Sequence, residues 1–316
     1  MIGGGFQNIF KIPELKKRIF FTLGLLIVYR IGVHVPVPGI DSIALSSFFA
    51  QAEGTIFGIF NMFSGGAFQR LSVFALGIMP YISASIILQL LTVVIPHLEQ
   101  LKKEGEQGRK KITQYTRYGT VVLSIIQGFG ISVGLESMTS PGGAPVVLMA
   151  GWGFRLLTVI TLTAGTAFIM WLGEQITERG VGNGISLIIF AGIVTGLPAA
   201  IVNTVRLLST GEMGIFAILI LLILMVAVVG LIIFVEQGQR RIPVQYAKRV
   251  VGRRMYGGQS THLPLKINTS GVIPPIFASS IIMFPATIGS FVKVEWIQNV
   301  TAAMRPGNLV YELLFI

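Results

Sequence analysis

Few residues of this 316-residue chain have the types and spacing that covalent chemistry requires. The segment 130–134 (GISVG) matches G-x-S-x-G, the pattern that exposes a nucleophilic serine, but it lies in an apolar run already rich in Gly and Ser. Asp41 is the only aspartate, which excludes a catalytic pair of aspartates. The three histidines lack the spacing of metal ligands: His34, His97 and His262. The sequence therefore predicts neither an enzyme nor a cofactor or metal site.

Ionisable residues within the apolar runs would indicate an ion-coupled transporter, because a buried ionisable group binds the coupling ion or proton. The acids lie instead in loops or at the ends of the runs, as Glu174, Glu178 and Glu236 do, except for Glu312, which lies in the incomplete run 309–316. Arg30 and Arg155 lie within runs, but long basic side chains near the end of a span usually extend to the interface. An ion-coupled small-solute transporter with a broken helix at the midplane is kept as the alternative function.

Two pairs of isoleucines have the spacing of one helical turn. Ile78 and Ile82 form one pair, and Ile185 and Ile189 form the other. Ordinary helix packing predicts the same pattern. If the fold brings the two faces together, a ring of isoleucines would form a narrow dewetted constriction that blocks ions.

A basic segment from Glu236 to Asn268 contains seven Lys and Arg residues and one acid. Positive-inside bias and attraction to anionic lipid explain most segments of this kind. A docking site for ribosomal RNA or for an acidic cytosolic partner is the alternative, because arginine interleaved with Tyr246 and Tyr256 suits phosphate and base contacts.

The elements that carry these residues are predicted to be membrane spans. Hydrophobic residues make up 53% of the chain and charged residues 12%, and the mean hydropathy is +0.77, which predicts an all-α polytopic membrane protein. Apolar runs long enough for a bilayer core predict seven spans: 19–37, 71–95, 118–135, 154–172, 185–202, 215–235 and 271–292. The run 309–316 is expected to begin an eighth span, so the sequence is interpreted as a C-terminally truncated fragment.

The second span is expected to be broken. Ile56 to Phe63 would give only about 12 Å of helix, whereas Leu71 to Ile95 would give about 37 Å. Ser64, Gly65 and Gly66 lie between these two pieces. Because irregular backbone at membrane depth is tolerated only beside protein or a water-filled cavity, the short piece is predicted to line a pore or central site.

Charge bias sets the orientation. Of the 24 Lys and Arg residues, 18 fall in the alternate segments 1–18, 96–117, 173–184 and 236–269. Basic residues accumulate in cytoplasmic loops, so the N-terminus is predicted to be cytoplasmic.

Several long motifs resemble the SecY family, the channel subunits of the bacterial Sec protein translocon. They are FNMFSGGAFQR, ALGIMPYISASIILQLL, KKEGEQGRKKITQYTRYGT, MWLGEQITERGVGNGIS, GQRRIPVQYAKR, QSTHLPLKIN and GVIPPIFASS. The similarity runs in order from about Leu15 to the end, and several ordered, ungapped motifs are far more specific than one short pattern.

The resemblance implies a ten-span inverted-repeat clamshell, of which this chain would hold spans 1 to 7 and the start of span 8. Residues 1–205 would form the N-terminal half and residues 206–316 part of the C-terminal half, with a cytoplasmic loop at 236–269. The half-helix would be the plug that seals the external funnel, formed by Thr55, Ile56, Phe57, Gly58, Ile59, Phe60, Asn61, Met62, Phe63, Ser64, Gly65 and Gly66.

The same resemblance assigns a pore ring and a lateral gate. The pore ring would include Ile78, Ile82, Ile185, Ile189 and Ile276. The gate, through which signal sequences and hydrophobic segments leave sideways, would include Ser83, Ile86, Gln89, Gln127, Ser279 and Ile282.

The implied function is a protein-conducting channel in the bacterial cytoplasmic (inner) membrane that passes unfolded polypeptides across and releases hydrophobic segments laterally. The implied partners are SecE, SecG, the SecA ATPase, the ribosome and a preprotein or nascent chain with a signal sequence, besides anionic lipid. The contacts with SecA or ribosomal RNA would be made by Arg240, Arg241, Lys248, Arg249, Arg253 and Arg254.

Overall fold

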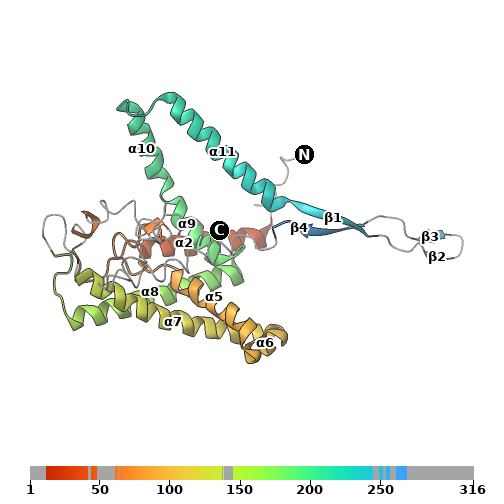
Figure 1. Cartoon of the computed structure of the whole chain (residues 1–316), viewed down its shortest axis with the longest axis horizontal. Helices are drawn as coiled ribbons and strands as arrows, with labels where there is room; N and C mark the ends of the chain where they lie inside the picture. The colour runs from red at the N-terminus through yellow and green to blue at the C-terminus, as the bar shows by residue number, and fades with distance from the viewer. Residues whose placement is uncertain are drawn as a thin grey trace. The chain divides into compact units, whose positions relative to one another are not determined.

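A computed structural model describes residues 12–41, 44–47, 61–62, 64–136, 138, 145–244, 249–251, 254–256 and 261–268. Its helices are α2 (Pro13–Gly32), α5 (Met79–Val94), α6 (Pro96–Lys103), α7 (Glu106–Glu136), α8 (Trp152–Arg179), α9 (Gly184–Val194), α10 (Leu197–Ser209) and α11 (Ile215–Gln237) (Figure 1). Its strands are β1 (Gln239–Val244), β2 (Arg249–Val251), β3 (Arg254–Tyr256) and β4 (Thr261–Lys266). Described residues up to Ala199 belong to one compact unit, and those from Ala200 to another.

Four helical stretches in the described part are long and apolar enough to cross a membrane. They are α7, α8, the stretch Gly184–Ser209 formed by α9 and α10, and α11. They coincide with the predicted spans 118–135, 154–172, 185–202 and 215–235. The predicted runs 271–292 and 309–316 lie outside the described residues.

The second span differs from its prediction, because the helix begins at Met79 and not at Leu71. Residues 71–73 instead form an antiparallel bridge with residues 35–37: the Val37 amide donates to the Leu71 carbonyl at 2.9 Å. Leu71 has φ +37° and Gly77 has φ +57°, which a right-handed helix does not allow. The connecting segment (residues 64–78) is therefore non-helical, and α5 has 16 residues, or about 24 Å.

The first predicted span also ends earlier than expected. Helix α2 covers Pro13–Gly32, whereas the apolar run extends to Val37. Pro36 and Pro38 follow the helix, and proline disfavours helical conformation in the residue before it. The apolar residues beyond Gly32 therefore pair with the connecting segment.

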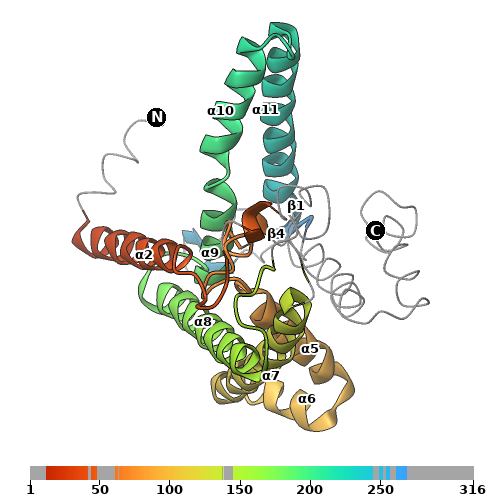
Figure 2. The same cartoon turned by 90° about the vertical axis from the view of Figure 1, so that its left-hand side faces the viewer.

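Helices α5 and α6 are separated by a bend of 100° at Ile95. Ile95 is extended, with φ −97° and ψ 114°, as expected for a residue that precedes proline. Pro96 begins α6, which follows α5 at this bend (Figure 2). Leu98 and Leu101 of α6 are buried. Neither helix alone is long enough to cross a membrane, and the two together would do so only as a bent pair.

Helices α7 and α8 pack side by side (Figure 2). Small residues recur every four positions along α7 and are buried: Thr116, Thr120, Ser124, Gly128 and Ser132. A Cβ on Gly128 would lie 3.5 Å from Cα of Val159 in α8. Small residues at helix contacts in membranes allow such close backbone approach.

Two ion pairs join these helices. Arg117 in α7 binds Glu174 in α8, with Nε–Oε1 at 2.9 Å and Nη2–Oε2 at 2.8 Å. Arg155 in α8 binds Glu136 in α7, with Nη2–Oε2 at 2.5 Å. Because the helices carry these partners near opposite ends, the two pairs fix both their spacing and their register.

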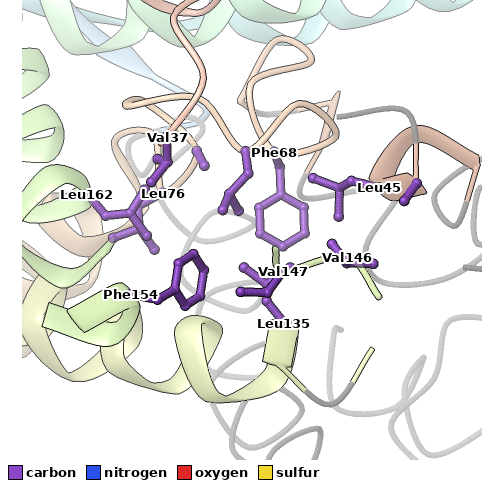
Figure 3. Close-up of a cluster of buried hydrophobic side chains, with 12 residues drawn as sticks. Val37, Leu45, Phe68, Leu76, Leu135, Val146, Val147, Phe154 and Leu162 are labelled. Carbon is purple, nitrogen blue, oxygen red and sulfur yellow. The ribbon is translucent and has the colours of Figure 1, made fainter. Parts of the chain in front are cut away.

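The first unit contains two hydrophobic clusters. One is formed by the start of α8, the end of α7 and the connecting segment, together with Val37, Ala44, Leu45, Val146 and Val147. Figure 3 shows Phe68 of the connecting segment among these side chains. The other joins α2, α8 and α9 to the connecting segment through Tyr29, Ala67, Ile169 and Ile188. The connecting segment contributes to both clusters, so non-helical backbone lies at the centre of this unit.

The second unit contains α11 and a β ribbon. No residue of α11 is buried, as expected for a helix that exposes an apolar surface to lipid or to other spans. Strand β1 pairs antiparallel with β4, from Gln239↔Lys266 to Val244↔Thr261, and β2 pairs with β3. At the base of the ribbon, Asn268 Nδ2 donates to Glu236 Oε1 at 2.8 Å.

Candidate channel site

The turn between α8 and α9 positions Ile185 and Ile189. Asn183 caps α9, and its side-chain oxygen accepts from the amides of Ile185 and Ser186. A Cβ on Gly184 would overlap the Gly173 carbonyl oxygen, so only glycine allows this close approach of the two helices. The sequence G-V-G-N-G at 180–184 is thus a sharp turn that begins α9 directly beside α8.

The start of α5 positions Ile78 and Ile82. Ile78 is the residue before the first turn of α5, and its carbonyl accepts from the amide of Ile82 at 3.1 Å. Pro80 lies within the first turn, where its missing N–H leaves no bond unmade. The helix therefore begins with the two isoleucines on one face.

Four of the five predicted ring isoleucines meet in one cluster. Ile78 is buried there at 5% exposure, and Ile82, Ile185 and Ile189 are partly buried against it. Ile276 lies outside the described residues. The structure thus places both pairs at one buried cluster, and their function as a constriction stays a prediction.

The end of the predicted plug is a compact polar loop. Thr55 to Phe60 and Phe63 lie outside the described residues, whereas Asn61, Met62, Ser64, Gly65 and Gly66 lie within them. The side chain of Asn61 makes two hydrogen bonds to Gln69: Oδ1 accepts from the backbone amide at 3.0 Å, and Nδ2 donates to Oε1 at 3.2 Å. The Asn61 carbonyl also accepts from the amide of Gly66 at 2.9 Å. These bonds close the loop on itself.

Helix α2 holds this loop through two adjacent residues that sequence reasoning did not assign to the site. Tyr29 Oη donates to the Ser64 carbonyl at 3.3 Å, and Arg30 Nη1 donates to the Gly65 carbonyl at 2.8 Å. The sequence feature that could have indicated this role is Arg30 itself, a charged residue within the apolar run 19–37. Its side chain binds the loop and does not extend to the membrane interface as predicted.

The predicted lateral-gate residues lie on α5 and α7. Ser83, Ile86 and Gln89 are spaced by three along α5, and Gln127 lies on α7. The two helices pack together, with Ala84 Cβ 3.4 Å from the Cβ position of Gly119. Ser279 and Ile282 lie outside the described residues, so the opposite side of the gate is not described.

The basic segment forms a ribbon where the sequence had indicated a loop. Arg240 and Arg241 are exposed on β1, while Arg249 and Arg254 belong to β2 and β3. Lys248 and Arg253 lie outside the described residues. Alternation of side chains along a ribbon places Arg240 and Arg241 on opposite faces.

The SecY family model matches residues 72–316. The protein translocase subunit SecY of Escherichia coli (strain K12) is 56% identical over 308 residues, which are 96% of this chain and 69% of that protein. The same subunit from Buchnera aphidicola is also 56% identical, and 86% of its length is covered. This chain belongs to the SecY family.

Solved structures agree on the fold. A protein-conducting channel aligns with TM-score 0.64 at 19% identity and covers 90% of this chain and 63% of that chain. Sec61 in a canine ribosome–channel complex aligns with TM-score 0.62 and the same coverages. The present chain therefore shares the fold of these channel proteins and covers roughly two thirds of the length of the matched chains.

Membership of the SecY family leaves no support for the alternative function, an ion-coupled small-solute transporter. The matched relatives are translocase subunits, so they do not favour a small-solute transporter. Glu174, which follows the predicted span 154–172, is held in the ion pair with Arg117. Ser132 of the G-x-S-x-G match is buried, and its hydroxyl donates to the Phe129 carbonyl at 2.7 Å. Among the described residues, no group of three His, Cys, Asp or Glu side chains is arranged to hold a metal.

Proposed function

We propose that this chain forms, together with the remainder of the SecY fold, a channel that translocates unfolded polypeptides across the cytoplasmic membrane and releases hydrophobic segments sideways into it. The observation that carries the proposal is the convergence of Ile78, Ile82, Ile185 and Ile189 beside the segment that connects the plug to α5. Residues 1–205 serve as the N-terminal half of the clamshell and residues 206–316 as part of the C-terminal half.

The ring acts as a compliant seal. A translocating polypeptide has polar backbone that must not meet lipid, so the path has to be aqueous on both sides of a constriction. Branched aliphatic side chains close around varied substrates and deny hydration to ions. We expect Ile276 of the predicted seventh span to complete the ring, and residues 55–66 to cover it from the external side.

The lateral gate sorts segments by hydrophobicity. About 20 apolar residues partition favourably into lipid. Ser83, Ile86 and Gln89 on α5 and Gln127 on α7 form one side of this gate, and Ser279 and Ile282 form the other. A signal sequence that enters between the two sides reaches lipid, while the polar chain that follows continues through the ring.

Cytosolic partners supply the driving force. The basic residues of the segment 236–268 contact SecA or ribosomal RNA on the cytoplasmic face, and this segment also binds anionic lipid. These residues are Arg240, Arg241, Lys248, Arg249, Arg253 and Arg254. Support comes from the exposure of Arg240 and Arg241 and from a solved relative described as part of a ribosome–channel complex. SecE braces the two halves, and SecG is peripheral. The N-terminus is cytoplasmic.

The constriction is tested by the double change Ile82→Ser with Ile189→Ser in the full-length channel. Polar side chains at this point should hydrate the closed pore and raise its resting ion conductance in planar bilayers by about tenfold or more. Ile160→Ser on α8 is the control, because Ile160 is 66% exposed and lies outside both clusters. Wild-type conductance in the double variant would remove these residues from the constriction.

A further inference from the structure

Arg30 has an unusual environment for a charged side chain. It lies in the last turn of α2, in a run of apolar residues, and a charge in such a segment is usually functional. Within the described part of the chain no carboxylate forms an ion pair with it, and its guanidinium donates instead to the Gly65 carbonyl, 35 residues away. The partner of this charge is thus a backbone group of the plug loop.

Gly65 is confined on two sides. Its φ of +65° favours glycine, and a Cβ at this position would lie 2.9 Å from Cα of Gly192 in α9 and 3.4 Å from Nη1 of Arg30. The backbone of the plug loop is therefore held between α2 and α9. Helix α9 is also the helix that carries Ile185 and Ile189.

Tyr29 fixes the preceding peptide group. Its hydroxyl donates to the Ser64 carbonyl, and its ring stacks on Phe74 with centroids 5.9 Å apart. Tyr29 is 2% exposed and Ser64 is 4% exposed, so the bond is shielded from water. Two consecutive residues of α2 thus bind two consecutive carbonyls of the plug loop.

We propose that Tyr29 and Arg30 are positioning residues that fix the point at which the plug joins the channel wall, and that they thereby set how strictly the channel discriminates between signal sequences. The inference rests on the proposed channel function. When the two bonds are made, the loop that ends at Gly65 is anchored against α9 and the closed arrangement is favoured. Loss of either bond frees this junction, so a weaker signal sequence suffices to open the channel.

The experiment measures export of a reporter by the full-length channel with its partner subunits in cells, with an intact and with a defective signal sequence. The variants are Arg30→Met, which removes the donor, Arg30→Lys, which retains one, and Tyr29→Phe, which removes only the hydroxyl. Arg70→Met is the matched control, because Arg70 is an exposed arginine five residues after Gly65.

Arg30→Met should raise the ratio of defective-signal to intact-signal export about tenfold, as expected for loss of a charge-assisted hydrogen bond. Tyr29→Phe should raise it about fivefold, since the lost bond is neutral. Arg30→Lys should return the ratio most of the way to wild type, which a purely structural role of the long side chain would not predict.

The proposal is overturned if Tyr29→Phe and Arg30→Met both keep the wild-type ratio, or if Arg70→Met raises it equally. Should Arg30→Met fail to accumulate, as judged by immunoblot, Tyr29→Phe decides, because it keeps the ring and its stacking on Phe74. Failure of the wild-type complex to export the intact-signal reporter would count against the channel function itself and not against this junction.

Discussion

The α7–α8 pair and the connecting segment (residues 64–78) belong to the same unit and hold their conformations in different ways. The pair consists of regular helices with small buried residues at their contact and an ion pair towards each end. The connecting segment has no regular structure, and its hydrogen bonds come largely from residues 29–37 and from its own turns. The conformation of α7 and α8 is thus fixed by hydrogen bonds within each helix and by contacts between the two helices. The conformation of the connecting segment depends on hydrogen bonds from other parts of the chain.

This difference suits the two functions that we propose. A channel wall has to keep its position while substrates pass, and two helices tied at both ends provide that. A junction between wall and plug has to release. Most of the connecting segment is buried in the two clusters, but Ser64 and Gly65 at its start are bound to α2 by two individual hydrogen bonds. Each of the following changes tests one side of this comparison.

The largest effect is expected where the two regions touch. A Cβ on Gly165 in α8 would overlap the Val73 carbonyl oxygen, so Gly165→Val should force the helix away from the connecting segment. Overpacking of this kind destabilises by about 1–3 kcal/mol, which thermal unfolding of the purified full-length complex would detect. In Gly153→Val, the matched control on α8, the new Cβ has no neighbour within 4 Å, and stability should be unchanged. Equal melting temperatures for the two variants would show that the connecting segment moves to make room for the valine without loss of stability.

A smaller effect is expected for the ion pair between Arg117 and Glu174. Arg117→Glu should destabilise the α7–α8 pair by about 1 kcal/mol, because the arginine side chain is half exposed and solvent screens the charges. The double exchange Arg117→Glu with Glu174→Arg should recover most of the loss, and a double-mutant cycle of unfolding free energies measures the recovery. An exchange that recovers nothing would mean that the helix contact, not the pair, fixes the register.

The smallest effect is expected in α6, outside the spans. The hydrogen bond from Lys103 lowers the pKa of the Glu99 carboxyl, so any stabilisation is present above the ordinary pKa of glutamate and is lost as the pH falls through the lowered value. Glu99→Gln should therefore change helicity slightly at neutral pH and not at all once the carboxyl is protonated. Circular dichroism of the complex at both pH values measures it. A difference that persists in acid would trace to packing and not to charge.

Predictions from the sequence were confirmed where a pattern of neighbouring residues is enough to determine the structure. The spans at 118–135, 154–172 and 215–235 follow from apolar length alone, and α7, α8 and α11 cover them. The isoleucine pairs were found from their helical spacing, and the family follows from the ordered motifs. The ribbon of β1 and β4 was missed because 16 residues separate the two strands, and their pairing is not a local property.

The errors concern residues whose conformation depends on distant partners. Leu71 to Ile78 are apolar and were expected to be helical, but residues 71–73 pair with residues 35–37. Arg30 was interpreted as reaching to the interface, because nothing in the sequence indicates that a carbonyl 35 residues away accepts its hydrogen bond.

The sequence by itself determined that this is a helical membrane protein of the SecY family, because the lengths of the apolar runs and the order of the motifs can be identified without knowing the fold. Only the tertiary structure decided that the helix expected from Leu71 begins at Met79, that the isoleucines of α5 and α9 share one cluster, and that Tyr29 and Arg30 bind the carbonyls of Ser64 and Gly65. The physical reason is that backbone groups in a non-helical segment need hydrogen-bond partners, and those partners can come from any part of the chain that the fold brings near.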